Sequence, residues 1–135
     1  MSVIKRRISW NKPNQPQFPI SRFMKTIFIW AEAIRQSNTL TTWEMMEDKV
    51  RSFCRVNDIE INYACQRIIA ILTKKIQQIN MGTPTSIGEY KVDVGQIPLF
   101  ESLIEVCRMI REKEFVNLKE EIMAAKLFQA PHLIF

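Results

Sequence analysis

Residues 59–80 read IEINYACQRIIAILTKKIQQIN, and this stretch decides the fold. Its apolar side chains recur at intervals of three and four residues, at Ile61, Cys65, Ile68, Leu72, Ile76 and Ile79. That interval is the period of an α-helix with one buried face, and Ile69 and Ile71 widen the face. We therefore expect a long central helix from Ile59 to about Asn80, covered on more than one side and capped by Asp58.

Two helices are predicted before the central one. Ser21 is a good N-cap, and the apolar residues after it keep helical spacing as far as about Gln36. Thr41 and Glu44 have the spacing of a capping box, which opens a second helix. The buried side chains of that second helix are expected to be Trp43, Met46, Val50, Phe53 and Cys54.

A small β-hairpin is predicted after the central helix. Residues 89–94 alternate polar and apolar side chains, as a half-buried strand does. The partner strand is expected at residues 78–81, at the expense of the helix end, with Gly82 and the residues after it in the connection.

Two further helices complete the prediction. Pro98 suits the first turn of a helix that runs to about Lys113. Asn117 with Glu120 resembles a cap for a last helix, which ends before Pro131. The inward side chains of that helix are predicted to be Leu118, Ile122, Ala125 and Phe128. The fold class is therefore mainly α, with about five helices around the long central one.

The organisation predicted from composition is an arm followed by one domain. A chain of 135 residues with 47% hydrophobic residues suits a single globular core. Residues 1–19 contain three of the six prolines, which favours a basic extended arm. Residues 20–135 form the helical domain, divided into a main unit (20–96) and a C-terminal element (97–135).

The compartment predicted from the sequence is intracellular, either cytoplasm or a host nucleus, and not a secreted one. No apolar run is long enough to cross a membrane, and no secretory signal follows the basic start MSVIKRRISW. The three cysteines are an odd number and lie among apolar residues at helical spacing. We expect them to be buried thiols and not disulfides.

The residues for common catalytic sites are missing from the sequence. His132 is the single histidine, so a histidine-activated nucleophile or a histidine-containing zinc site would depend on it alone. Three glycines cannot build a phosphate-binding loop or a dinucleotide fingerprint. We therefore predict a protein without enzymatic activity, metal or cofactor, which acts by binding.

The charge distribution points to an anionic partner at the N-terminus. Residues 1–35 carry seven Lys or Arg against one acid, whereas residues 76–135 carry six against eight. The cations of the arm, Lys5, Arg6, Arg7 and Lys12, are therefore candidates for contacts with phosphates. A solvated tail is the alternative interpretation of the same charges.

The order of the predicted elements over residues 21–95 resembles a winged-helix DNA-binding domain. This resemblance implies that the third helix is the recognition helix and that residues 83–91 are the wing. It assigns DNA contacts to the helix residues Asn62, Tyr63, Gln66, Arg67, Lys74 and Lys75 and to Lys91 in the wing. Glu60 at the helix tip and the single cation of the wing oppose this assignment.

The functional prediction is a small DNA-binding regulator of transcription or replication, of viral, phage or plasmid type. RNA or an anionic membrane is an alternative ligand of the arm. The predicted helices from Pro98 to Gln129 would join a homodimer on paired half-sites about one helical turn apart. The alternative function is a helical protein-interaction module, such as a viral accessory, matrix or adaptor protein, that binds a host or viral protein through apolar helix surfaces.

Overall fold

The structure is a computed structural model that describes residues 17–38 and 42–134, with side chains as far as Lys126. Its elements in chain order are α2 (Ile20–Ser37), α3 (Trp43–Val56), α4 (Ile61–Asn80), β1 (Thr85–Ile87), β2 (Tyr90–Val92), the 3-10 helix η1 (Val94–Gln96) and α5 (Ile97–Ile134). The prediction of a mainly α fold with a small hairpin is confirmed for this part of the chain.

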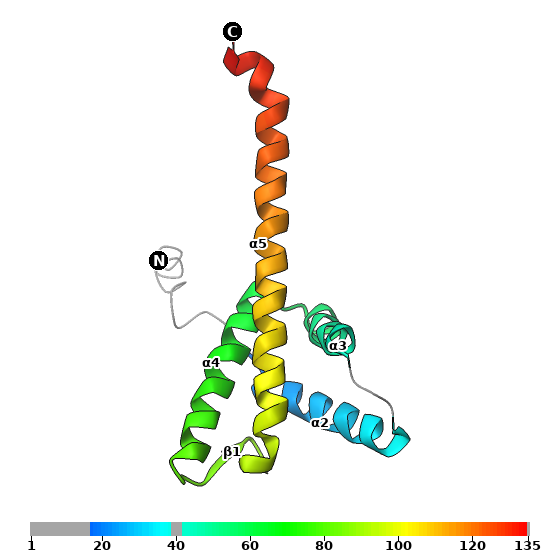
Figure 1. Cartoon of the computed structure of the whole chain (residues 1–135), viewed down its shortest axis with the longest axis vertical. Coiled ribbons are helices and arrows are strands. Elements are labelled where there is room, and N and C mark those ends of the chain that lie inside the picture. The colour runs from blue at the N-terminus through cyan, green and yellow to red at the C-terminus, as the bar shows by residue number, and fades with distance from the viewer. Residues whose placement is uncertain (1–16, 39–41, 135) are drawn as a thin grey trace, which may run out of the picture.

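Helix α5 forms the axis of the molecule (Figure 1). Its first half lies between α4 on one side and α2 and α3 on the other, with the hairpin at its base. Its second half extends beyond all the other described elements, and we call residues 115–134 the stalk. Helix α4 packs most extensively against α5, so α5 and not the predicted third helix occupies the central position.

The core lies where the first half of α5 meets the other elements. An aromatic group joins the start of α2 to α3: the ring of Phe23 lies 5.6 Å from that of Phe18 and 5.1 Å from that of Phe53. The predicted stripe of α4 faces this core, with Cys65, Ile68 and Leu72 fully buried. Trp43, predicted to be buried, is 49% exposed because it stands at the first position of α3, beyond the packed turns.

The starts of the helices differ from the prediction by one or two residues. Helix α2 begins at Ile20 with Pro19 as its N-cap, before the predicted Ser21. The predicted cap Thr41 lies outside the described residues, and the hydroxyl oxygen of Thr42 accepts the hydrogen bond from Met45 N at 3.2 Å. Helix α4 begins at Ile61, because Asp58 has a positive φ of 56° and belongs to the turn before the helix.

The hairpin uses a different first strand from the one predicted. Residues 78–80 stay helical, because Gly82 adopts a φ of 79° and closes the helix with a hydrogen bond from its N–H to Ile79 O. Strand β1 therefore comes from the expected loop, and Ser86 pairs with Lys91 in the antiparallel register. Ile87 and Val92 are its buried side chains.

The last two predicted helices are one continuous helix. Residues 113–126 contain no glycine or proline, and most of them are good helix formers, so the cap-like spacing of Asn117 and Glu120 does not interrupt α5. The backbone also stays helical through Pro131, where the prediction ended the helix. The predicted boundary at residue 117 is therefore wrong.

A network of ion pairs fixes α3 to α5. The Glu47 carboxylate accepts hydrogen bonds from Lys113 Nζ at 2.8 Å and from Arg51 Nε at 2.9 Å. Arg51 Nη1 also donates to the Glu114 carboxylate at 3.0 Å. The hydrogen bond from Lys113 lowers the pKa of Glu47, and the hydrogen bond from Arg51 adds to this against the effect of partial burial.

Replacing Glu47 by glutamine is expected to lower the free energy of unfolding at pH 7 by about 1 kcal/mol. A lowered pKa in the folded state means that the carboxylate stabilises the protein above its unfolded pKa and loses this effect as pH falls through the folded pKa. The difference between wild type and E47Q should therefore shrink towards zero at about pH 3 in urea unfolding followed by circular dichroism. D48N, which changes an exposed neighbour, is the control; an equal loss in both variants contradicts the role of the network.

Candidate nucleic-acid interface

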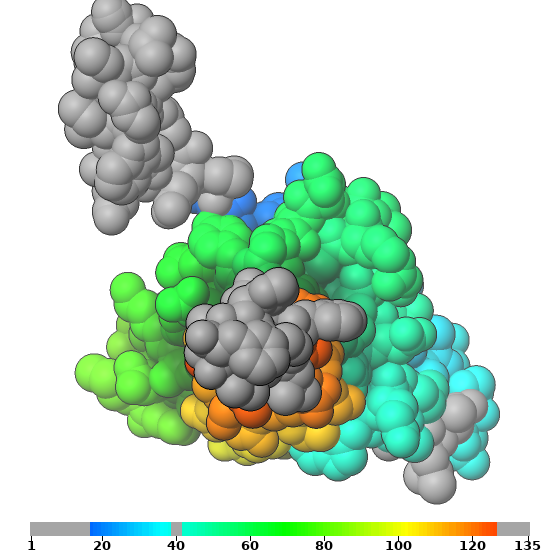
Figure 2. Space-filling view, turned by 90° about the horizontal axis from the view of Figure 1, so that it is seen from above, coloured from blue at the N-terminus to red at the C-terminus, as the bar shows by residue number. Residues whose placement is uncertain are grey.

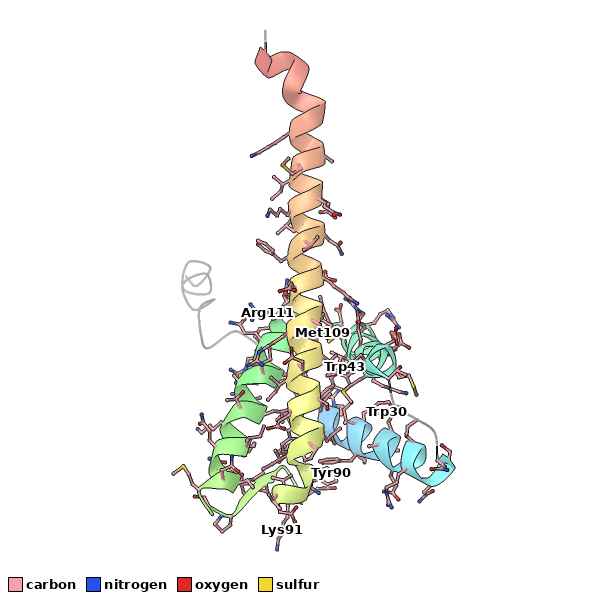
Figure 3. The ribbon with its side chains drawn as sticks, viewed as in Figure 1. Trp30, Trp43, Tyr90, Lys91, Met109 and Arg111 are labelled. Atoms are coloured by element: carbon pink, nitrogen blue, oxygen red, sulfur yellow. The ribbon has the colours of Figure 1, made fainter. Side chains whose placement is uncertain are left out.

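The predicted contact residues fall into three groups in the folded chain. Lys5, Arg6, Arg7 and Lys12 of the arm lie outside the described residues. Asn62, Tyr63, Gln66, Arg67, Lys74 and Lys75 all belong to α4. Lys91 lies in β2, at the base of the molecule (Figure 3).

The outer face of α4 is exposed over most of its length. Gln66, Arg67, Ala70, Lys74 and Gln77 follow one another at intervals of one to four residues, and all are exposed. They lie opposite the buried side of the helix. The helix contains no aspartate or glutamate from Ile61 to Asn80, so this face presents only cations, amides and small side chains.

Glu60, which opposed the prediction, is bound to the backbone at the start of α4. Its carboxylate accepts hydrogen bonds from Asn62 N at 2.9 Å and from Tyr63 N at 2.8 Å. The acid therefore acts as the N-cap of the helix, where the helix dipole favours a negative charge. Its charge is directed at the helix end and away from the positions that follow Tyr63.

Tyr63 does not belong to the exposed face. Its side chain is half-buried, packs against the core and lines a hollow of about 530 Å³ together with Phe18, Arg22 and Asn57. Gln17, Phe18 and Pro19, which precede α2, line the same hollow, a tertiary arrangement that helical spacing alone does not reveal. Asn62, by contrast, is exposed beside the base of the stalk.

The fold brings two predicted lysines together at the end of α4. Lys75 and Lys91 line one shallow hollow of about 660 Å³, with Gln78, Thr85 and Ser86 between them. The hydroxyl of Thr85 donates to Gln78 Oε1 at 2.8 Å, which holds β1 against the helix. Asp93 at the rim accepts a hydrogen bond from Gly95 N and caps η1. Two cations beside hydroxyl and amide groups form a surface suited to a phosphate.

The cysteines show no sign of nucleophilic chemistry. All three are buried and free. Burial raises the pKa of Cys54 to about 11, and the hydrogen bond with Cys65, together with burial, raises the pKa of Cys107 far above its usual range. These two thiols are therefore protonated at neutral pH and are weak nucleophiles.

Metal-binding clusters and membrane-spanning helices are both absent from the described part of the chain. Among these residues, no group of three or more His, Cys, Asp or Glu side chains is placed to hold a metal ion. None of the described helices is long and apolar enough to cross a membrane.

The stalk is a surface that the sequence analysis assigned differently. Leu118 and Ile122 were predicted to face inward, yet they are 54% and 48% exposed, and Phe115 is 62% exposed. The apolar side chains do recur at helical spacing, but nothing in the sequence showed that α5 would extend past its neighbours.

No family model, curated protein or solved structure matches the chain.

Proposed function

We propose that this protein binds duplex DNA without catalysing a reaction, as a small regulator of transcription or replication. The observation that carries the proposal is the outer face of α4. It has cations and amides, lacks acids along the whole helix, and ends beside the Lys75 and Lys91 hollow.

The chemistry of this face fits the edges of base pairs and the phosphates around them. An α-helix fits the major groove, where Gln66 and Arg67 are of the types that form paired hydrogen bonds with adenine and guanine. Lys74, Lys75 and Lys91 are suited to the flanking phosphates. Three helices followed by a two-stranded hairpin are also the order of elements that the winged-helix resemblance implies.

The test is the affinity for a short DNA duplex, measured by fluorescence anisotropy over a series of salt concentrations. K75Q/K91Q is expected to weaken binding about 60-fold at about 0.1 M salt and to reduce the salt slope by about 1.8, because each lost phosphate contact removes about 0.9 from that slope. Competition with single-stranded RNA separates the two nucleic acids, and we expect the duplex to bind more tightly.

K25Q/K49Q is the control with the same change of charge. These lysines belong to α2 and α3, on the other side of α5 from α4, so the variant should retain most of the affinity (Figure 1). Equal losses in the two variants would show that net charge alone drives binding. Unchanged binding by K75Q/K91Q would assign the contacts elsewhere, and failure of wild type to bind any duplex at low salt ends the proposal.

A protein-interaction role is the second candidate, and the exposed apolar side chains of the stalk favour it. Monomeric proteins rarely leave a run of large apolar residues uncovered. Phe115, Val116, Leu118, Ile122 and Met123 are all more than 40% exposed. A partner that binds K75Q/K91Q normally but not L118D supports this role over DNA binding.

A further inference from the structure

The two ends of α4 present different surfaces to a large partner. At its first turn, α4 lies against α5 where the stalk begins, since Asn62 lines a hollow of about 860 Å³ with Phe115 and Leu118 of the stalk. Its last turn stands beside the hairpin, at the far end from the stalk (Figure 1). The helix has 20 residues and is therefore about 30 Å long. A DNA major groove is about 12 Å wide, so a groove that receives one end of α4 does not touch the other.

The stalk obstructs an approach to the first turn of α4. Helix α5 continues past this turn over residues 115–134, which span about 30 Å. In helix-turn-helix docking, the first residues of the recognition helix enter the major groove and contact the base edges. To receive Asn62 in this way, a duplex would also have to occupy the stalk side of α4, where α5 already lies. The first turn is therefore closed to this kind of docking.

The charges around the first turn also oppose a polyanion. The hollow beside Asn62 is lined by three carboxylates and two guanidinium groups, those of Glu112, Glu114, Glu121, Arg108 and Arg111. Arg51 Nη1 donates to Glu114 at 3.0 Å, and Arg108 Nη1 donates to Glu105 at 3.4 Å. The two remaining carboxylates, together with that of the N-cap Glu60, outnumber the remaining guanidinium group. This end of α4 therefore repels phosphates.

The hairpin end of α4 has the opposite character. Lys74 and Lys91 are exposed there, and Lys75 shares the hollow of about 660 Å³ with Lys91. Asp93, at the rim of that hollow, caps η1. Glu89 belongs to the hairpin turn, whose Gly88 lies against the start of α2. Three cations against two acids make this end attractive to phosphates.

Salt keeps the two ends electrically independent. At about 0.1 M salt, exposed charges more than about 10 Å apart are largely screened from each other. The ends of α4 are about 30 Å apart, so the acids beside Asn62 do not cancel the attraction at Lys91. Figure 3 shows this separation, with Arg111 beside the upper end of α4 and Lys91 at the base of the molecule.

We propose that duplex DNA meets α4 from its hairpin end and along its outer face, while the first turn of the helix stays outside the groove. The lysines of the hairpin end contact phosphates, and Arg67 reaches the base edges from the side. The exposed turn at residues 81–84 joins the contact surface, because Pro84 lines the hollow of Lys75 and Lys91. Asn62 takes no part. This inference rests on the proposed DNA binding and states how the duplex docks.

The test adds one positive charge at either end of α4 and measures the affinity of the full chain for a short duplex by fluorescence anisotropy. Thr83 is exposed in the turn after α4, and Asn117 is exposed and lines the hollow beside Asn62. T83K is expected to tighten binding about eightfold at about 0.1 M salt and to raise the salt slope by about 0.9, because it adds one phosphate contact. N117K, the matched control, should change the affinity by less than about twofold.

Two outcomes would overturn this docking. One is a gain of affinity in N117K as large as that in T83K, which places the duplex at the first turn or shows that net charge alone matters. The other is a T83K variant that gains no affinity although wild type binds, which places the contacts away from the hairpin end. Failure of wild type to bind any duplex is a different result, because it ends the proposed function and this docking with it. Unchanged circular dichroism, expected because both sites are exposed, shows that the variants are folded.

Discussion

Replacing Phe23 by alanine is expected to lower the free energy of unfolding by about 4 kcal/mol, the largest effect of a single change that we predict. Phe23 is fully buried at the start of α2 and contacts the rings of Phe18 and Phe53 edge to face. Its loss removes this apolar surface from the core and leaves a cavity between α2 and α3. Urea unfolding followed by circular dichroism measures the difference.

Phe115→Ala is the matched control for this prediction. Phe115 is 62% exposed on the stalk, so the same truncation should change the free energy of unfolding by less than about 0.5 kcal/mol. Similar losses in F23A and F115A would mean that the stalk is part of the cooperative core, contrary to the packing described above.

The parts of the fold that sequence predicts well are those set by local spacing. The stripe of Cys65, Ile68 and Leu72 was predicted from its helical period and is buried. A helix with one apolar face packs that face against the core. The same period predicted that Gln66, Arg67 and Lys74 would be exposed, and they are.

The errors come from features that depend on neighbours distant in sequence. Asn117 and Glu120 have the spacing of a cap, yet a cap pattern inside a run of helix formers does not end a helix. The alternation of residues 89–94 predicted the second strand, but β1 has only three residues and gives almost no alternating signal, so its place is known only from the pairing of Ser86 with Lys91. The spacing of α4 likewise could not show that Tyr63 would be half-buried and line one hollow with residues that precede α2.

In the candidate site, too, local spacing predicts some features and contacts between distant residues set the others. The cations of α4 were found from its exposed face, but their relation to Lys91 depends on how the hairpin folds back on the helix end. That relation is fixed by contacts of the hairpin with α2: the ring of Tyr90 packs on Phe28, with centroids 5.2 Å apart, and the turn at Gly88 lies against Ser21. The turn is therefore the point at which a small change should affect the site most.

Replacing Gly88 by alanine is expected to lower the free energy of unfolding by about 3 kcal/mol, from two separate causes. Gly88 has a φ of +60°, a conformation that costs other residues about 1–2 kcal/mol. An added Cβ would also lie 2.3 Å from Ser21 Oγ and 2.9 Å from Ser21 Cβ, so the turn or the start of α2 must move. Thermal and urea unfolding measure the loss.

Two further variants separate the causes. Gly82 has a φ of +79° with nothing within 4 Å of an added Cβ, so G82A carries the backbone cost alone and should lose about 1 kcal/mol. S21G/G88A removes the contact while keeping the strained φ, and should recover more than about 1 kcal/mol of the G88A loss. If G82A and G88A lose the same amount, the contact with Ser21 does not hold the hairpin in place. If G88A loses more and S21G restores it, α2 positions the turn, and with it the place of Lys91 beside α4.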